Sequence, residues 1–87
     1  MAEVPQPSID FVEERLSTGQ RLKQARESRS LSVEDVAARL NISAAYIRAL
    51  EDMNVNALPR LPFVRGYIRA YARYVELSGD ELVQGFN

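Results

Sequence analysis

The chain has 87 residues, a length that suits one small domain with a single core. Hydrophobic residues make up 46% and charged residues 26%, which is typical of a globular chain and not of a disordered one. The net charge is -1 and the sequence has neither cysteine nor histidine, which excludes disulfides, thiolate chemistry and the commonest general base and metal ligand, so we expect no enzyme, no cofactor and no metal site.

Charge is distributed unevenly along the chain. Residues 1–18 and 76–87 are each net acidic, whereas residues 19–75 hold ten basic and five acidic side chains. Residues 1–16 contain two prolines and no sustained hydrophobic period, which predicts a flexible acidic arm. They lack the features of a signal peptide, and no window approaches the roughly 20 apolar residues of a membrane span. We therefore expect residues 17–87 to form one soluble domain.

Two serine caps predict the first two helices. Ser17 and Gln20 have the spacing of a capping box, so a helix begins there and runs to about Ser28. Ser32 precedes the segment VEDVAARL, whose apolar residues recur at the spacing of one helical face. Each of these helices is expected to turn an apolar side toward the core.

A tight corner and a third helix follow. Asn41 suits the left-handed conformation that ends a helix, and Ser43 can cap the next one, so about three residues join the two helices. The third helix is expected from Ala44 to about Asp52. The segment MNVNALPRLP is predicted as a loop, because two prolines and two asparagines interrupt any helical period.

Two further helices complete the predicted domain. Pro62 can occupy the first turn of a fourth helix that continues to about Val75. Ser78 and Glu81 then have the spacing of a cap for a short fifth helix. Every predicted element is helical, so the expected fold is an all-α, five-helix domain.

The second and third helices, with a leading helix behind them, have the layout of a helix-turn-helix. The segment GQRLKQARESRSLSVEDVAARLNISAAYIRALE, residues 19–51, resembles the lambda-repressor-like (Xre-type) helix-turn-helix family. That resemblance implies a pair between an arginine late in the first helix and a glutamate that ends the third. Arg26 and Glu51 match these positions, and we expect a structural ion pair between them.

The second half resembles the cytoplasmic domain of the RodZ family of bacterial cell-shape proteins. The resemblance lies in LPRLPFVRGYIRAYARYVEL, around its R-G-Y-I-R-x-Y-A-R core. It implies a domain on the cytoplasmic face of the bacterial inner membrane that binds the actin-like protein MreB, with a membrane anchor farther along the chain. Phe63 and Tyr67 match the aromatic pair implied to contact MreB, and the nearby Arg65 and Arg69 are candidates for acidic groups on that partner.

A helical wheel divides the fourth helix into three sectors. Its aliphatic sector suits a core, and its arginine sector suits water. The aromatic sector, with Phe63, Tyr67, Tyr71 and Tyr74, lies at the border, where half-buried aromatics beside arginine are typical of interface hot spots. The alternative is that these aromatic rings pack into the core, and it has more support for Tyr71 and Tyr74 than for Phe63 and Tyr67.

The helix-turn-helix layout also makes DNA binding an alternative function. Base edges are read mainly by Arg, Lys, Asn and Gln at the start of the recognition helix, but Ala44 and Ala45 stand there. Arg48 is the candidate for a base or phosphate contact, and Arg39 adds to the basic surface. Glu51, expected to face outward, would repel phosphates. We therefore prefer a cytoskeletal adaptor domain that binds MreB through the fourth helix, and keep a DNA-binding transcription regulator as the alternative.

Overall fold

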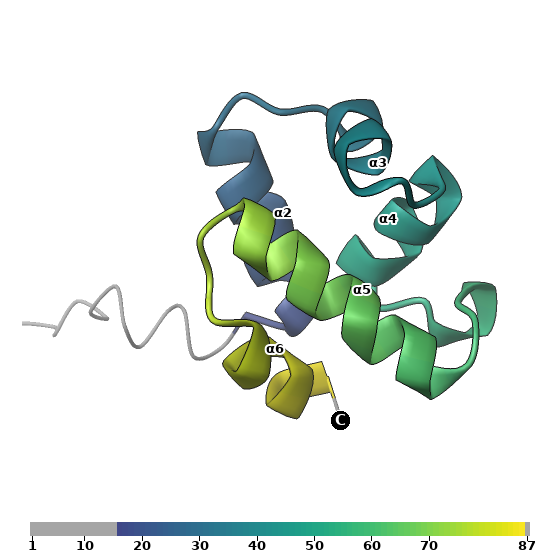
Figure 1. Cartoon of the computed structure of the whole chain (residues 1–87). Coiled ribbons are helices and arrows are strands. Elements are labelled where there is room, and N and C mark those ends of the chain that lie inside the picture. The colour runs from purple at the N-terminus through teal and green to yellow at the C-terminus, as the bar shows by residue number, and fades with distance from the viewer. Residues whose placement is uncertain (1–15, 87) are drawn as a thin grey trace, which may run out of the picture.

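The computed structural model describes residues 16–86, and within that range it contains five α-helices, one 3-10 turn and no strand. Their order is α2 (Thr18–Ser28), α3 (Val33–Leu40), α4 (Ala44–Glu51), η1 (Val55–Ala57), α5 (Leu61–Tyr74) and α6 (Gly79–Phe86). The predicted all-α, five-helix class is confirmed (Figure 1). The predicted arm, residues 1–16, lies outside the described residues apart from Leu16.

Reciprocal hydrogen bonds fix the starts of α2 and α3. The Ser17 hydroxyl accepts from the Gln20 backbone N–H at 3.1 Å, and the Gln20 side chain accepts from the Ser17 N–H at 3.0 Å. Ser32 and Asp35 repeat the arrangement at 2.9 and 2.8 Å, and the hydrogen bond from the Ser32 N–H lowers the pKa of Asp35. Both predicted serine caps are confirmed, since each helix begins at the residue after its serine.

The corner between α3 and α4 is as short as predicted. Asn41 ends α3 in the left-handed region, with φ 56° and ψ 43°, and the Ile42 N–H donates to the Ala37 carbonyl at 3.1 Å. The Ser43 hydroxyl then accepts from the Tyr46 N–H at 3.1 Å and begins α4. This turn places α4 at an angle to α3, which is the helix-turn-helix arrangement (Figure 1).

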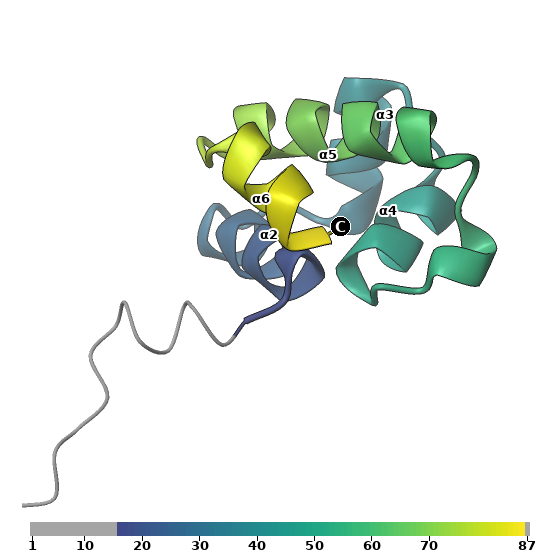
Figure 2. The same cartoon turned by 90° about the horizontal axis from the view of Figure 1, so that it is seen from below.

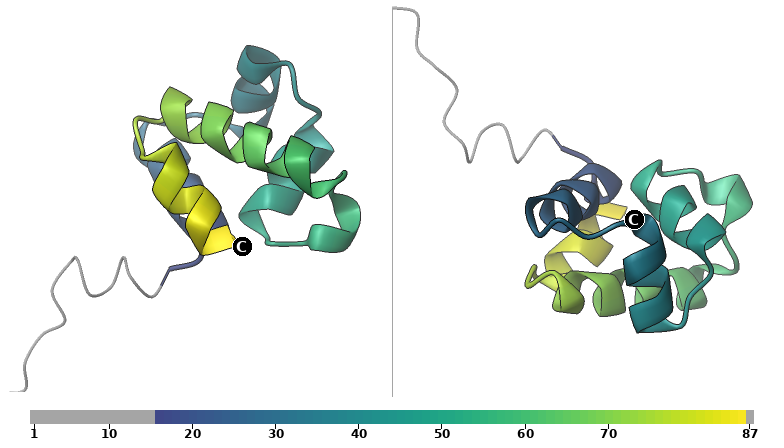
Figure 3. Two further views of the ribbon diagram at one scale, coloured as in Figure 1. Left: turned by 60° about the horizontal axis from the view of Figure 1, so that its bottom comes forward. Right: turned by 90° about the horizontal axis from the view of Figure 1, so that it is seen from above.

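All five α-helices supply side chains to one core. The long helix α5 crosses over the others (Figure 2), and α6 folds back beside it (Figure 3). The side chains most completely removed from water are Leu22, Val36, Ile47, Leu50, Val64, Ile68, Tyr71, Ala72, Val75 and Leu82. Because Val64, Ile68 and Val75 are all buried, the aliphatic sector predicted for the fourth helix does face the core.

The segment predicted as a loop, residues 53–62, is partly helical. Val55–Ala57 form the 3-10 turn η1, and α5 begins at Leu61. A single 3-10 turn is too short to produce a hydrophobic period, so the sequence pattern does not reveal it. Pro62 lies in the first turn of α5, as predicted, where its missing N–H leaves no hydrogen bond unmade.

The start of α2 contacts two other helices, α4 through the backbone of Gly19 and α6 through the side chain of Thr18. A Cβ atom on Gly19 would lie 2.3 Å from the carbonyl oxygens of both Leu50 and Glu51, at the end of α4. Beside it, the Thr18 hydroxyl donates to the Leu82 carbonyl of α6 at 2.7 Å. The absence of a side chain at Gly19 therefore lets α2, α4 and α6 meet at one point.

Replacing Gly19 with alanine should lower the free energy of unfolding by about 2 kcal/mol or more, because the new methyl group meets two carbonyl oxygens. Gly66→Ala is the matched control. Nothing lies within 4 Å of a Cβ atom there, so alanine should stabilise α5 by roughly 0.5–1 kcal/mol. Urea unfolding of both variants and the parent chain measures the two changes. Equal free energies for the two variants would contradict the close approach.

Candidate partner-binding surface and buried ion pair

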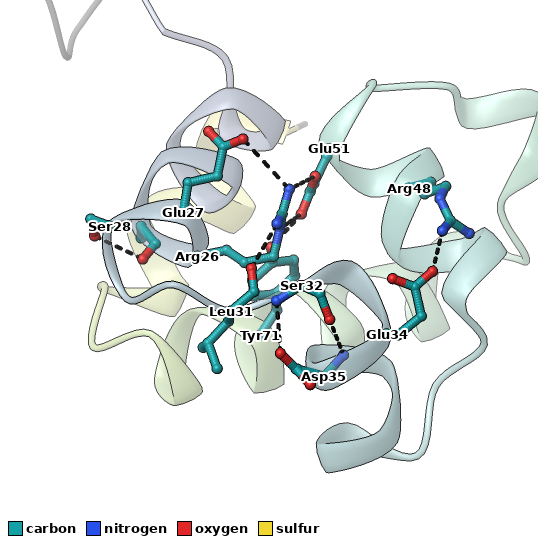
Figure 4. Close-up of polar contacts among 11 residues, drawn as sticks. Arg26, Glu27, Ser28, Leu31, Ser32, Glu34, Asp35, Arg48, Glu51 and Tyr71 are labelled. Atoms are coloured by element: carbon teal, nitrogen blue, oxygen red, sulfur yellow. Dashed lines mark hydrogen bonds and ion pairs between the residues drawn. The ribbon is translucent and has the colours of Figure 1, made fainter.

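Arg26, Glu51 and Tyr71 come together inside the domain, from α2, α4 and α5 respectively (Figure 4). The Nε and Nη2 atoms of Arg26 donate to the two carboxylate oxygens of Glu51 at 2.7 and 3.1 Å, and the Tyr71 hydroxyl donates to the same carboxylate. Arg26 and Glu51 are 8% and 6% exposed, and Tyr71 is fully buried. The residues matched by family resemblance therefore form a bidentate pair with a third, neutral donor.

The buried network has a partner for each polar group. The Glu51 carboxylate raises the pKa of Arg26, which keeps the guanidinium charged, and Arg26 also donates to the Leu31 carbonyl at 2.8 Å. Burial raises the pKa of the Tyr71 hydroxyl well above its usual range, and the Glu51 carboxylate raises it further. Within the described part of the chain, no buried side-chain nitrogen or oxygen lacks a hydrogen-bond partner. The few polar side chains in the apolar interior therefore all form hydrogen bonds.

Two sequence predictions about these residues are wrong. Tyr71 is predicted at the partner-binding border, yet it belongs to the core, because it lies toward the aliphatic sector of α5 and its hydroxyl binds Glu51 inside the domain. Glu51 is predicted to face outward from α4, but it is buried, because Arg26 balances its charge. Neither side chain is open to a partner or to DNA.

The open side of α5 carries aromatic rings near the start of the helix. Phe63 is 58% exposed, although its neighbour Val64 is buried. One turn later, the ring of Tyr67 is partly buried against Tyr46 of α4, with the two centroids 5.9 Å apart. Gly66 lies exposed beside them, with nothing within 4 Å of a Cβ atom. This part of α5 thus carries the exposed ring of Phe63 and the ring of Tyr67 packed on Tyr46. The small Gly66 leaves space for another molecule to approach the helix closely.

At the far end of α5, Tyr74 is partly buried beside a cation. The guanidinium carbon of Arg39, from α3, lies 5.6 Å from the centroid of the Tyr74 ring. A cation at that distance is attracted to the face of an aromatic ring. A candidate DNA contact and a candidate partner contact therefore share one corner of the domain.

The arginines of α5 form a basic strip beside the aromatic rings. Arg65 is partly buried, whereas Arg69 and Arg73 are exposed. The Nε atom of Arg69 lies 3.3 Å from a carboxylate oxygen of Asp80 in α6, an exposed pair of little energetic weight. Residues 53–75 contain no acidic side chain. Apart from the Asp80 carboxylate, this strip is therefore positively charged.

The outward side of α4 offers few groups to a DNA base. Its start carries Ala44, which is partly buried, and Ala45, which is exposed. Arg48 is exposed as well, but its guanidinium forms an ion pair with the Glu34 carboxylate of α3 (Figure 4). The pKa of Glu34 is lowered, first by a backbone N–H and then by Arg48. The basic side chain at this position is thus partly neutralised within the domain.

The sequence of residues 21–82 matches the family described as a helix-turn-helix domain. The chain belongs to this helix-turn-helix domain family. No solved structure gives a significant match to it. Helix-turn-helix domains bind DNA or proteins and are typically non-catalytic, so the family indicates recognition without naming the partner.

In this helix-turn-helix domain, α3 and α4 form the motif and α4 takes the position of the recognition helix. The Arg48 and Glu34 pair therefore joins the two helices of the motif. Within residues 16–86, no helix is long and apolar enough to span a bilayer, and no group of His, Cys, Asp and Glu is arranged to hold a metal ion.

Three features of the helix-turn-helix domain are absent from the sequence predictions. Val55 of η1 and Leu61 of α5 are 59% and 44% exposed. Their position in VNALPRLP could have indicated this exposure. Prolines prevent a continuous helix there, and such connecting segments lie at the surface. Glu34 is the third, and nothing in the sequence identifies it as the partner of Arg48, since the two residues are 14 positions apart on different helices.

Glu51→Ala should lower the free energy of unfolding by about 3–5 kcal/mol, because it leaves the Arg26 charge buried without its partner. Glu27→Ala is the matched control. Glu27 also approaches Arg26, at 4.0 Å, but from an exposed position, so its loss should change stability by less than about 0.5 kcal/mol. Chemical denaturation measures both. Similar small losses in the two variants would show that the buried pair does not stabilise the fold.

Stability should fall as the pH rises above about 10. An unfolded tyrosine loses its proton near that pH, whereas the raised pKa of Tyr71 keeps the proton on the folded chain. The folded state then holds more protons than the unfolded state, so each rise in pH favours unfolding. Tyr71→Phe should be less stable by about 1–2 kcal/mol at neutral pH, because the Glu51 carboxylate loses a donor, but its stability should decline less at alkaline pH. Denaturation curves at neutral and alkaline pH compare the slopes, and parallel declines would contradict the assignment.

Proposed function

We propose that this chain is the cytoplasmic adaptor domain of a RodZ-like cell-shape protein and binds the actin-like protein MreB through α5. The observation that carries the proposal is the exposure of Phe63, whose ring stands open in a helix that also supplies Val64 and Ile68 to the core. A large exposed aromatic ring is typical of a binding hot spot. The resemblance of this helix to the RodZ family supplies the identity of the partner.

The surroundings of Phe63 support the same function. Tyr67 is held against Tyr46, so its ring has little conformational freedom left to lose on binding. Arg65 and Arg69 lie on the adjoining basic strip, where they suit acidic groups of a partner. Tyr71 takes no part, because it is buried.

In this proposal the domain works at the cytoplasmic face of the bacterial inner membrane. The full-length protein is anchored in that membrane farther along the chain, and the domain connects the anchor to the MreB filament. Such an adaptor holds the filament near the membrane and catalyses no reaction. The exposed ring of Phe63 supports this role, because it stands on a helix whose other side packs in the core.

A DNA-binding transcription regulator is the second candidate, because family membership and the position of α4 favour it. Its contacts would come from Arg48 and Arg39, with Ala44 and Ala45 nearest the bases. However, Arg48 is paired with Glu34 and Arg39 lies beside Tyr74. Arginines engaged in this way suit contacts to phosphate better than the reading of base edges.

The double variant Phe63→Ala, Tyr67→Ala should weaken co-sedimentation with MreB filaments about 30-fold, which corresponds to about 2 kcal/mol. The loss is expected because the partner would bury both rings. The single variant Phe63→Ala should show part of the loss without disturbing the core, since its ring is 58% exposed. The measurement is the pelleted fraction across a range of MreB concentrations, with thermal unfolding as the check on folding.

Arg48→Ala is the control that separates the two candidates. Arg48 is exposed on α4 and its guanidinium pairs with Glu34 of α3, so this variant should bind MreB within about twofold of the parent chain. If the chain is instead a DNA-binding regulator, Arg48→Ala should reduce the retardation of DNA in a gel shift. Undiminished MreB binding by a folded double variant would refute the adaptor.

A further inference from the structure

We infer that the partner-binding surface extends from α5 onto η1, where an apolar depression receives one apolar side chain from an acidic segment of the partner. The inference rests on the proposed function, because it assigns a second contact to the same partner. The depression has a volume of about 170 Å³ and is lined by Val55, Leu58, Pro59, Leu61, Val64 and Phe86. Small-molecule sites usually enclose roughly 300–1,000 Å³, so this depression suits a single side chain better than a separate ligand.

Two exposed apolar side chains, those of Val55 and Leu61, line this depression. The large hydrophobic residues that are exposed within residues 16–86 are Val55 at 59%, Leu61 at 44% and Phe63 at 58%. Single exposed apolar residues are ordinary, but Val55 and Leu61 lie together at one depression, as apolar residues of an interaction site do. Val64 lines the depression and directly follows Phe63 in α5. The depression therefore lies beside the first turn of α5, the turn that also carries Phe63.

The charge around the depression is positive. Arg60 is exposed at the start of α5, Arg65 lies in the next turn, and residues 53–75 contain no acidic side chain. The acidic residues of α6 stand in its first turn, whereas Phe86, which lines the depression, ends that helix. Complementary charge steers and orients a partner. The matching segment is therefore an apolar side chain with acidic neighbours.

The same observations disfavour two other occupants. A second copy of this chain would bring Arg60 and Arg65 against their own counterparts, and like charges placed together oppose association. An anionic bilayer would match the charge, but it offers a broad surface, whereas the depression is concave and of the size of one side chain. A protein segment fits both the shape and the charge.

The depression exists before any partner binds. In η1 the Leu58 N–H donates to the Val55 carbonyl at 3.2 Å, and at the start of α5 the Phe63 N–H donates to the Arg60 carbonyl at 3.0 Å. Pro59 adds a fixed φ between these two turns. A surface that is ordered in advance loses less conformational entropy on binding.

The pair of variants Val55→Glu and Val55→Lys tests the inference in the full chain. Both replace the exposed valine with a long charged side chain, and they differ in the sign of the charge. Val55→Glu should weaken co-sedimentation with MreB at least about tenfold, and Val55→Lys less than about threefold, because lysine still attracts an acidic segment. Both should unfold at the temperature of the parent chain, since Val55 is exposed. Phe63→Ala is measured beside them.

The outcomes separate this inference from the proposed function. If Phe63→Ala weakens binding but both Val55 variants bind like the parent chain, the inference is wrong and the adaptor stands. If none of the three variants weakens binding, both are wrong. Equal weakening by glutamate and lysine would overturn the acidic character of the partner segment. Dimerisation in sedimentation velocity, or binding to phosphatidylglycerol vesicles, that depends on Val55 would assign another occupant and overturn the inference.

Discussion

The fold depends on how the charges of Arg26 and Glu51 are accommodated away from water. Burying two ions costs several kcal/mol each, and their attraction offsets this cost only when the remaining hydrogen bonds are made. Here the Tyr71 hydroxyl and the Leu31 carbonyl complete them. Because Tyr71 must face the carboxylate, the rotation of α5 about its axis is fixed. A residue eight positions earlier lies about 80° around the helix, which places Phe63 at the surface. The buried pair thus determines which side of α5 remains open.

This rotation explains why α5, and not the recognition helix, provides the candidate surface. α4 is a short helix whose inner side, with Ile47 and Leu50, is used by the core, and whose outward side combines alanines with Arg48 in an ion pair. α5 is longer and crosses the other helices, so it can supply the core with one side and still leave a basic and aromatic strip outside. A helix-turn-helix domain can therefore present a candidate surface on the helix that follows its recognition helix without any change in the fold.

The features that residue patterns predict correctly are those that depend on near neighbours, whereas the pair of Arg26 and Glu51, 25 positions apart, is predicted only through family resemblance. Ser17 and Ser32 cap helices through bonds that span three residues, so the pattern is visible in the sequence itself. Asn41 likewise ends α3 by its own conformation. In contrast, Glu51 and Tyr71 are misplaced by a helical wheel, because a wheel treats a carboxylate as a group that faces water and cannot include partners 20 and 25 residues away. For the same reason, the exposed apolar residues of the proline-rich segment become recognisable as one surface only in three dimensions.

Pro62 influences how the candidate surface is presented. A proline directly before Phe63 could have left the ring at the end of a loop, but α5 begins at Leu61, and the N–H groups of Phe63 and Val64 both donate to the Arg60 carbonyl, at 3.0 and 3.2 Å. The ring of Phe63 is therefore attached to a formed helical turn, and Tyr67, four residues on, lies on the same side. Rings ordered in this way contribute mainly to how long a complex lasts, whereas exposed arginines act over longer distances and mainly increase the rate of encounter. The two kinds of residue on α5 should then be separable by salt, which screens the arginines and leaves the rings unaffected.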